Sequence, residues 1–148
     1  MIERILVASD GSPPAGRAVA VAGELAAALG AKVFLLYAVP TATHGSIPEG
    51  FEDLADLEHM TVGDVLQAVG EEILTRAEGK LRAAGVAAIE RLLPNGPAGP
   101  AILAAAANHE ADLVVLGSRG LGEVEGMLLG SVSHKVSQNA PCSCLTVK

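Results

Sequence analysis

Glycine and serine residues with the spacing of a phosphate site lie near the end of the sequence. Residues 117–120 (Gly-Ser-Arg-Gly) follow the apolar segment 112–116, and after nine further residues the run 130–133 (Gly-Ser-Val-Ser) opens a helical pattern. Glycine lets the backbone approach a ligand closely, and the unpaired N–H groups of a helix N-terminus favour an anion. The spacing therefore predicts a phosphate site to which the Ser131 and Ser133 hydroxyls can donate hydrogen bonds.

Three of the candidate residues also fit purely structural roles. Serine is a preferred N-cap residue, worth about 1 kcal/mol to a helix, so Ser131 can be a cap alone. Asp10 can cap a helix that begins near Pro13, or form the turn before Gly11. Arg119 fits an ordinary solvated loop residue. Both interpretations stay open for each of the three.

Apolar strand-like segments alternate with helical periodicity along the sequence. Strands are predicted at residues 5–8, 32–39, 86–93, 112–116 and 144–147, with helices between them that include a short one around residues 102–108. Such alternation predicts a parallel sheet with helices on both faces and right-handed crossovers. Glu90 and Arg91 in the middle of the third strand favour a place at the sheet edge. The length of 148 residues, half of them hydrophobic, predicts one α/β domain over residues 1–148.

Turns that could carry a ligand follow three of the predicted strands. Residues 9–11 (Ser-Asp-Gly) follow the first strand, Val39 ends the second, and residues 117–120 follow the fourth. Ligands of open parallel sheets bind beyond the carboxyl ends of the strands, where the strand order reverses. We therefore expect these three segments to meet at one pocket.

Charge and composition exclude several classes of partner. The formal net charge of −7 argues against nucleic acid, whose binding normally needs a basic face. No uncharged apolar run approaches the ~20 residues needed to span a bilayer, and residues 1–5 lack the features of a signal peptide. We therefore expect a cytoplasmic protein with neither a nucleic-acid nor a membrane partner. Cys142 and Cys144 are too close in sequence for an ordinary disulfide, and a reducing cytosol would leave them as thiols. The alternative is a redox pair or half of a zinc site, which would need a symmetry mate to supply the other ligands.

The motifs at the strand ends resemble those of the universal stress protein family, in its ATP-binding, UspA-like branch. The matching segments are residues 7–12 (VASDGS), 111–120 (ADLVVLGSRG) and 130–133 (GSVS). They meet the family signature of Gly, two residues, Gly, nine residues, Gly and then Ser or Thr. The resemblance covers essentially the entire sequence. It implies a Rossmann-like fold of the adenine nucleotide alpha hydrolase type, with a five-stranded sheet in the order 3-2-1-4-5.

The resemblance also implies ATP binding by a homodimer that pairs through its last strand, around Leu145 and Val147. Ser143 and Cys144 depart from the Pro and Val that family members often carry in this strand. Mg²⁺ or Mn²⁺ would be held mainly by the phosphates, so no residue is expected to be a dedicated metal ligand. The implied nucleotide-binding residues are Ala8, Ser9, Asp10, Val39, Gly117, Arg119, Gly120, Gly130, Ser131, Val132 and Ser133. Among them, Asp10 would lie beside the ribose or the metal-bound phosphates, and the backbone of Val39 would contact adenine.

Two enzyme classes fit the sequence less well than a binding protein does. Glycines at 120, 122 and 126 imitate a dinucleotide-binding fingerprint. That motif follows the first strand of its fold and has an acidic residue about 20 positions further on. Here the glycines follow the fourth predicted strand, and the position about 20 further on is Cys142. A Walker loop is missing from the sequence, as is a second acidic motif that could hold magnesium. We therefore expect an ATP-dependent sensor or adaptor of the stress response with at most slow hydrolysis and no catalytic residue. A slow ATPase, self-phosphorylation at Ser131 or Ser133, a ligand-free structural dimer, and ADP, AMP or a cyclic nucleotide as the ligand stay open as alternatives.

Overall fold

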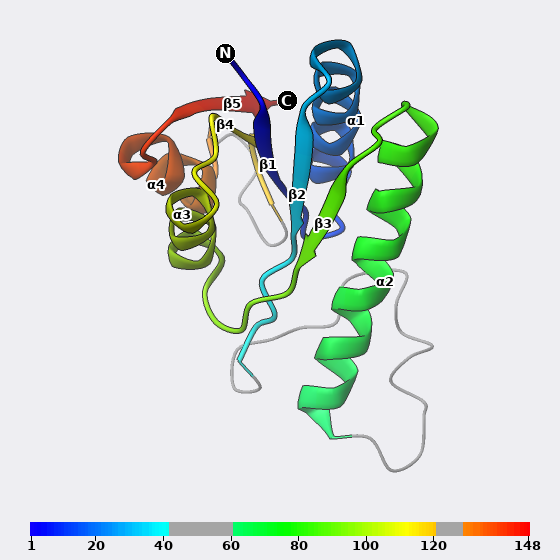
Figure 1. Ribbon diagram of the computed structural model, residues 1–148. Coiled ribbons are helices and arrows are strands. Elements are labelled where there is room, and N and C mark those ends of the chain that lie inside the picture. Colours follow the sequence, from blue (N-terminus) through cyan, green and yellow to red (C-terminus); the bar gives the residue numbers. More distant parts are fainter. Residues whose placement is uncertain (42–60, 121–128) are drawn as a thin grey trace.

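The computed structural model describes residues 1–41, 61–120 and 129–148. In these ranges, five parallel strands form one sheet in the order β3-β2-β1-β4-β5 (Figure 1). The strands are β1 (Arg4–Ala8), β2 (Lys32–Leu36), β3 (Ile89–Leu92), β4 (Leu113–Gly117) and β5 (Ser143–Val147). The predicted α/β fold and its strand order are therefore confirmed.

The described helices cover both faces of the sheet. The helices α1 (Pro13–Leu29) and α2 (Val62–Ala83) lie on one face, and α3 (Ala98–Asn108) and α4 (Ser131–Asn139) lie on the other (Figure 1). Successive residues of a strand point to opposite faces, so Ile5 and Val7 pack with α1 and α2 while Leu6 packs with α3 and α4. Within the described ranges, every helix is too short or too polar to span a lipid bilayer.

Three of the predicted strand and helix bounds differ from the structure by three residues or more. The regular part of β2 ends at Leu36, and Val39 instead forms an isolated bridge to Asn95. β3 begins at Ile89 because the N–H of Val86 donates to Leu81 O at 3.1 Å and closes the end of α2. The third helix begins at Ala98, four residues before the predicted 102, because proline is tolerated in the first turn of a helix.

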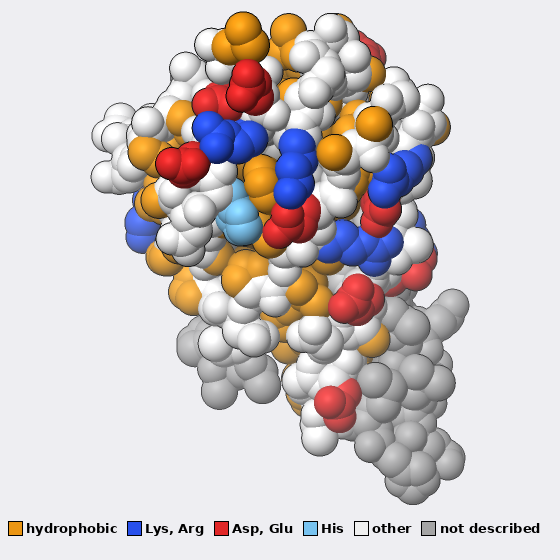
Figure 2. Space-filling model, in the orientation of Figure 1, with side chains coloured by type: hydrophobic (Ala, Val, Ile, Leu, Met, Phe, Trp, Pro, Cys, Tyr) orange, Lys and Arg blue, Asp and Glu red, His pale blue; other side chains and the backbone are white. Residues whose placement is uncertain are grey.

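Charged pairs line the β3 edge of the sheet, as the sequence pattern predicted for an edge strand. Lys32 Nζ lies 2.6 Å from Glu90 Oε2 across β2 and β3, and Arg91 forms ion pairs with Glu78 and Glu71 of α2. Figure 2 shows acidic and basic side chains next to one another over this part of the surface. Charges on an edge strand oppose pairing with a further strand. The ion pairs of Glu90 and Arg91 therefore protect the outer edge of β3 from pairing with a further strand.

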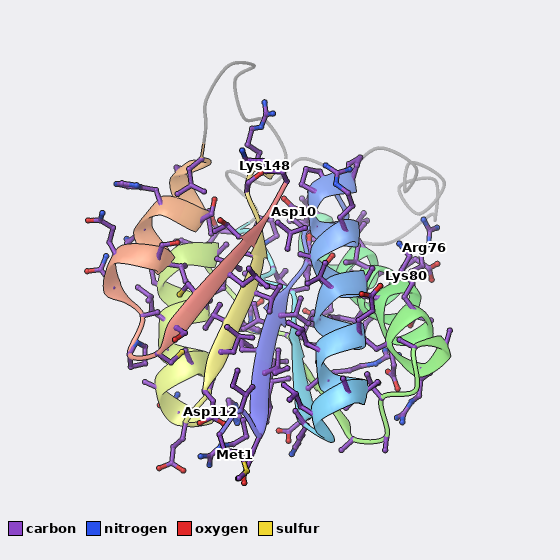
Figure 3. The ribbon with its side chains drawn as sticks, turned by 90° about the horizontal axis from the view of Figure 1, so that it is seen from above. Met1, Asp10, Arg76, Lys80, Asp112 and Lys148 are labelled. Atoms are coloured by element: carbon purple, nitrogen blue, oxygen red, sulfur yellow. The ribbon has the colours of Figure 1, made fainter. Side chains whose placement is uncertain are left out.

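Asp112 fixes the start of β1 to the start of β4. Its Oδ2 accepts hydrogen bonds from the backbone N–H groups of Glu3 and Arg4, both at 2.9 Å, at the end of the sheet where Figure 3 labels Asp112 and Met1. These two hydrogen bonds, followed by the Arg4 charge, hold the pKa of the Asp112 carboxyl below its usual value. The ionised carboxylate is therefore preferred in the folded state.

The lowered pKa of Asp112 gives a prediction for acid stability. A carboxyl whose pKa is lower in the folded than in the unfolded state stabilises the fold above the unfolded pKa, and the contribution is lost as pH falls through the folded pKa. Asp112→Asn is therefore expected to lower the urea midpoint at pH 7 and to have a smaller effect near pH 3. Urea unfolding of both proteins at the two pH values tests this, and an equal difference at both would contradict it.

Candidate functional site

A half-open pocket lies at the carboxyl ends of β1, β2 and β4, next to the point where the strand order reverses. Its volume is about 130 Å³. The turn after β1, the segment after β2, the loop after β4 and the starts of α3 and α4 contribute its lining, which consists of Ala8, Ser9, Asp10, Ala15, Leu36, Tyr37, Ala38, Ala98, Ile102, Leu116, Gly117, Arg119, Gly120, Val132 and Ser133. The expected meeting of the turns after the first and fourth strands is therefore present.

Most of the predicted site residues line this pocket. They are Ala8, Ser9, Asp10, Gly117, Arg119, Gly120, Val132 and Ser133. Val39 is buried beside the pocket without lining it, and Gly130 and Ser131 lie at the start of α4 next to the lining residue Val132. Tyr37 and Ala38 line the pocket and were missed by the sequence analysis. The only signal for them was their position just before Val39.

The backbone of Val39 is occupied by the segment that follows β3. Its N–H donates to Pro94 O at 2.8 Å, and its carbonyl accepts from Gly96 N at 2.8 Å. Ala38 lines the pocket instead, and its backbone has no hydrogen bond to another described residue. In an extended chain, the backbone N–H and C=O of successive residues point to opposite sides. A shift of one residue therefore decides whether the N–H and C=O of Ala38 or those of Val39 face the pocket. Both backbone groups of Val39 are therefore hydrogen-bonded within the protein, whereas Ala38 lines the pocket, and the contact of Val39 with adenine stays a prediction.

Asp10 joins the turn after β1 to the loop after β4. Its Oδ1 accepts from Ser12 N at 2.9 Å, which shapes the turn in which Gly11 has a φ of 83°. A Cβ added to Gly120 would lie 2.6 Å from Asp10 Oδ2, so the carboxylate lies directly against that glycine. The structural alternative for Asp10 is thus a turn and not a helix cap, because Ser12 is the N-cap of α1.

Three helices start near the pocket, and α1 has a side-chain cap whereas α3 and α4 begin without one among the described residues. At α1, Pro13 and Pro14 have no N–H, and the Ser12 Oγ accepts from Ala15 N at 3.3 Å. At α4 the N-cap is Gly130, and no side chain of the described residues caps the helix. The interpretation of Ser131 as the N-cap is therefore wrong, since it is the first helical residue. An N-terminus without a side-chain cap, with its positive dipole end, suits an anion.

The Ser133 hydroxyl holds α4 against the loop after β4. Its Oγ donates to Ser118 O at 2.8 Å and lies 3.3 Å from Gly130 O, and the side chain is buried. The N–H of Gly130 also donates to Ser118 O, at 2.6 Å. The hydroxyl proton expected to reach a phosphate is therefore directed at a backbone carbonyl. Ser133 can still offer its backbone N–H at the start of α4.

Asp10 and Arg119 are the charged residues among those lining the pocket. Arg119 is exposed at its mouth, and Asp10 is half-buried near Tyr37. Burial, and then the charge of Asp10, raises the pKa of the Tyr37 hydroxyl, which keeps it protonated as a potential donor. Tyr37 is held by α2, because a Cβ on Gly70 would lie only 2.7 Å from Tyr37 Cδ1.

The two cysteines lie outside this pocket, on the face of the sheet that α3 and α4 cover. Cys142 and Cys144 are half-buried thiols, and burial is the main cause that raises the pKa of both. A raised pKa lowers the thiolate fraction that would react or bind a metal. In the part of the chain that the structure describes, no group of three or more His, Cys, Asp or Glu side chains could hold a metal ion.

Comparison with known proteins agrees with the resemblance seen in the motifs. The model of the universal stress protein family matches residues 1–148. A universal stress protein of Thermus aquaticus is 38% identical, and universal stress protein YxiE of Bacillus subtilis is 35% identical, each match covering 100% of both chains. A solved universal stress protein in complex with cAMP is 29% identical, with a TM-score of 0.71, over 99% of this chain and 97% of its own. This chain therefore belongs to the universal stress protein family.

Proposed function

We propose that this protein binds an adenine nucleotide, ATP in the first place, and acts as a nucleotide-dependent sensor or adaptor in the stress response. The observation that carries the proposal is the pocket at the strand switch point, where the loop after β4 and α4 meet. The helix α4 starts there without a side-chain cap among the described residues. The relative solved with cAMP supports an adenine nucleotide as the class of ligand.

The pocket residues fit the parts of a nucleotide. Ala38 would offer its backbone to the base, between the apolar side chains of Leu36 and Ile102. Asp10 would accept hydrogen bonds from ribose hydroxyls, and Arg119 and the N-terminus of α4 would bind the phosphates. Asp10 is the only carboxylate among the described lining residues, so Mg²⁺ or Mn²⁺ would be held mainly by the phosphates.

The same residues favour binding over hydrolysis. General base catalysis needs a side chain that can accept a proton from the attacking water, and Asp10, the only carboxylate among the described lining residues, would be engaged by the ribose. The raised pKa of Tyr37 keeps its hydroxyl neutral. The nucleotide state would then act by changing what docks on the protein. We propose a homodimer through the outer edge of β5, where Leu145 is 36% exposed.

Analysis of the nucleotide that the protein retains tests the proposed function. The protein is purified without added nucleotide and denatured, and the released small molecule is identified by chromatography and mass spectrometry. We expect ATP or ADP near one molecule per chain. We also expect ATP with magnesium at a hundredfold of its Kd to stabilise the fold by about 2.7 kcal/mol. An empty protein that gains no thermal stability from ATP would favour a ligand-free dimer.

A further inference from the structure

A second groove lies between α1 and α2, next to the nucleotide pocket. Its volume is about 450 Å³, and Ser9 lines both spaces. Three of its lining residues are basic, namely Arg17 of α1 and Arg76 and Lys80 of α2, and none of the described lining residues is acidic. Arg76 and Lys80 are four residues apart, so they share one face of the helix, and Figure 3 shows them side by side. In a chain with a net charge of −7, this groove gathers three basic side chains, of which Arg76 is ion-paired with Glu72.

Lys80 is exposed and contributes its ammonium group to the groove. Its Nζ would lie 3.3 Å from a Cβ on Gly16, so the ammonium lies over the backbone of α1, where a glycine leaves it room. No described acidic group lies within ion-pair distance of Lys80, whereas Arg82 on the same helix forms an ion pair with Glu78 at 3.2 Å. A cation held between two helices without a nearby counter-charge attracts an anion.

The neighbours of Lys80 add donors and space. Arg76 and Arg17 both line the groove. Arg76 Nε donates a hydrogen bond to Glu72 Oε1, and Arg17 Nε donates one to Lys148 O, both at 2.8 Å. Two guanidinium forks and an ammonium suit the oxygens of a phosphate group. The small residues Gly16 and Ala77 leave the space in which such a group fits.

We propose that this groove is a second anion site, separate from the nucleotide pocket, that takes a small phosphate-bearing molecule. The phosphate lies between Arg76 and Lys80, with Arg17 at one side. Ser9 and the turn after β1 border both the groove and the nucleotide pocket. A phosphate bound in the groove would therefore lie next to the turn that carries Asp10. The proposal does not rest on the nucleotide function, because none of the three basic residues lines the nucleotide pocket.

A titration of the isotope-labelled protein with inorganic pyrophosphate at low salt tests the site. The backbone amide signals are recorded by NMR at each step. We expect the signals of Gly11, Gly16 and Gly79 to move along one binding curve. Lys80→Gln should weaken pyrophosphate binding about two- to fivefold, the effect of losing one exposed charged contact. Arg82→Gln is the matched control, because it removes the same charge from the same helix outside the groove.

The possible outcomes separate the groove from other sites. Shifts confined to Ser131–Ser133 would place pyrophosphate at α4 and overturn the proposal without touching the nucleotide function. Equal weakening by Arg82→Gln and Lys80→Gln would overturn it too, since general surface charge would then explain the binding. Citrate binding as tightly as pyrophosphate would overturn the preference for phosphate. Weaker pyrophosphate binding in Lys80→Gln but not in Arg82→Gln, with ATP affinity unchanged, would support the groove as a separate site.

Discussion

Gly117→Ala is expected to destabilise the protein by about 3 kcal/mol, because overpacking against backbone atoms forces a shift of whole elements. A Cβ at this position would lie 2.8 Å from the carbonyl carbon of Pro14 and 2.9 Å from Ala15 N. These are backbone atoms at the start of α1, which cannot rotate away as the end of a side chain could. Urea unfolding measured by circular dichroism should show the midpoint falling with an unchanged slope.

Gly79→Ala is the matched control for this prediction. Gly79 lies within α2, and a Cβ there would meet nothing within 4 Å. Replacing an exposed helical glycine by alanine is expected to stabilise the fold by about 0.5–1 kcal/mol. The same chemical change should therefore have opposite signs at the two positions. A Gly117→Ala protein with the wild-type midpoint would show that α1 is not packed against β4 as the structure has it.

The fold was predictable because its signals are local and repeated. Alternating apolar strands and helical stripes give the βα order, and Glu90 with Arg91 places β3 at an edge. The bounds were less predictable where one pattern serves two structures. Val86 looks like the start of a strand, yet its N–H closes α2, and the proline-rich start of α3 looks like a loop. Such choices depend on hydrogen-bond partners that residue types do not encode.

The candidate site was predictable at the level of segments and less so at the level of atoms. The glycine spacing located the loop after β4, and the strand ends brought Asp10 to it. The register after β2 could not be read from an apolar run, so Val39 was chosen where Ala38 lines the pocket. The target of the Ser133 hydroxyl was equally hidden, because a buried hydroxyl bonds whichever acceptor the fold places beside it.

Gly130→Val is expected to reduce ATP affinity at least about a hundredfold, or about 2.7 kcal/mol. Gly130 is buried at the start of α4 with a φ of −70° and a ψ of 163°, a conformation that any residue adopts. Backbone geometry therefore does not require glycine here. We infer that the absent side chain leaves space for phosphates beside the helix N-terminus, which the branched side chain of valine would fill. Isothermal titration with ATP and magnesium measures the loss.

The folded state of the variant decides how this result is interpreted. Gly79→Val introduces the same side chain on α2, where a Cβ would meet nothing within 4 Å, and should retain wild-type ATP affinity. A Gly130→Val protein with a native circular dichroism spectrum and no ATP binding would support the phosphate site at α4. Wild-type ATP affinity in a folded Gly130→Val protein would contradict that site, even if the purified protein carries nucleotide. The position of the phosphates is thus tested separately from the presence of a ligand, because valine changes the space at α4 and leaves Ala38 and Asp10 in place.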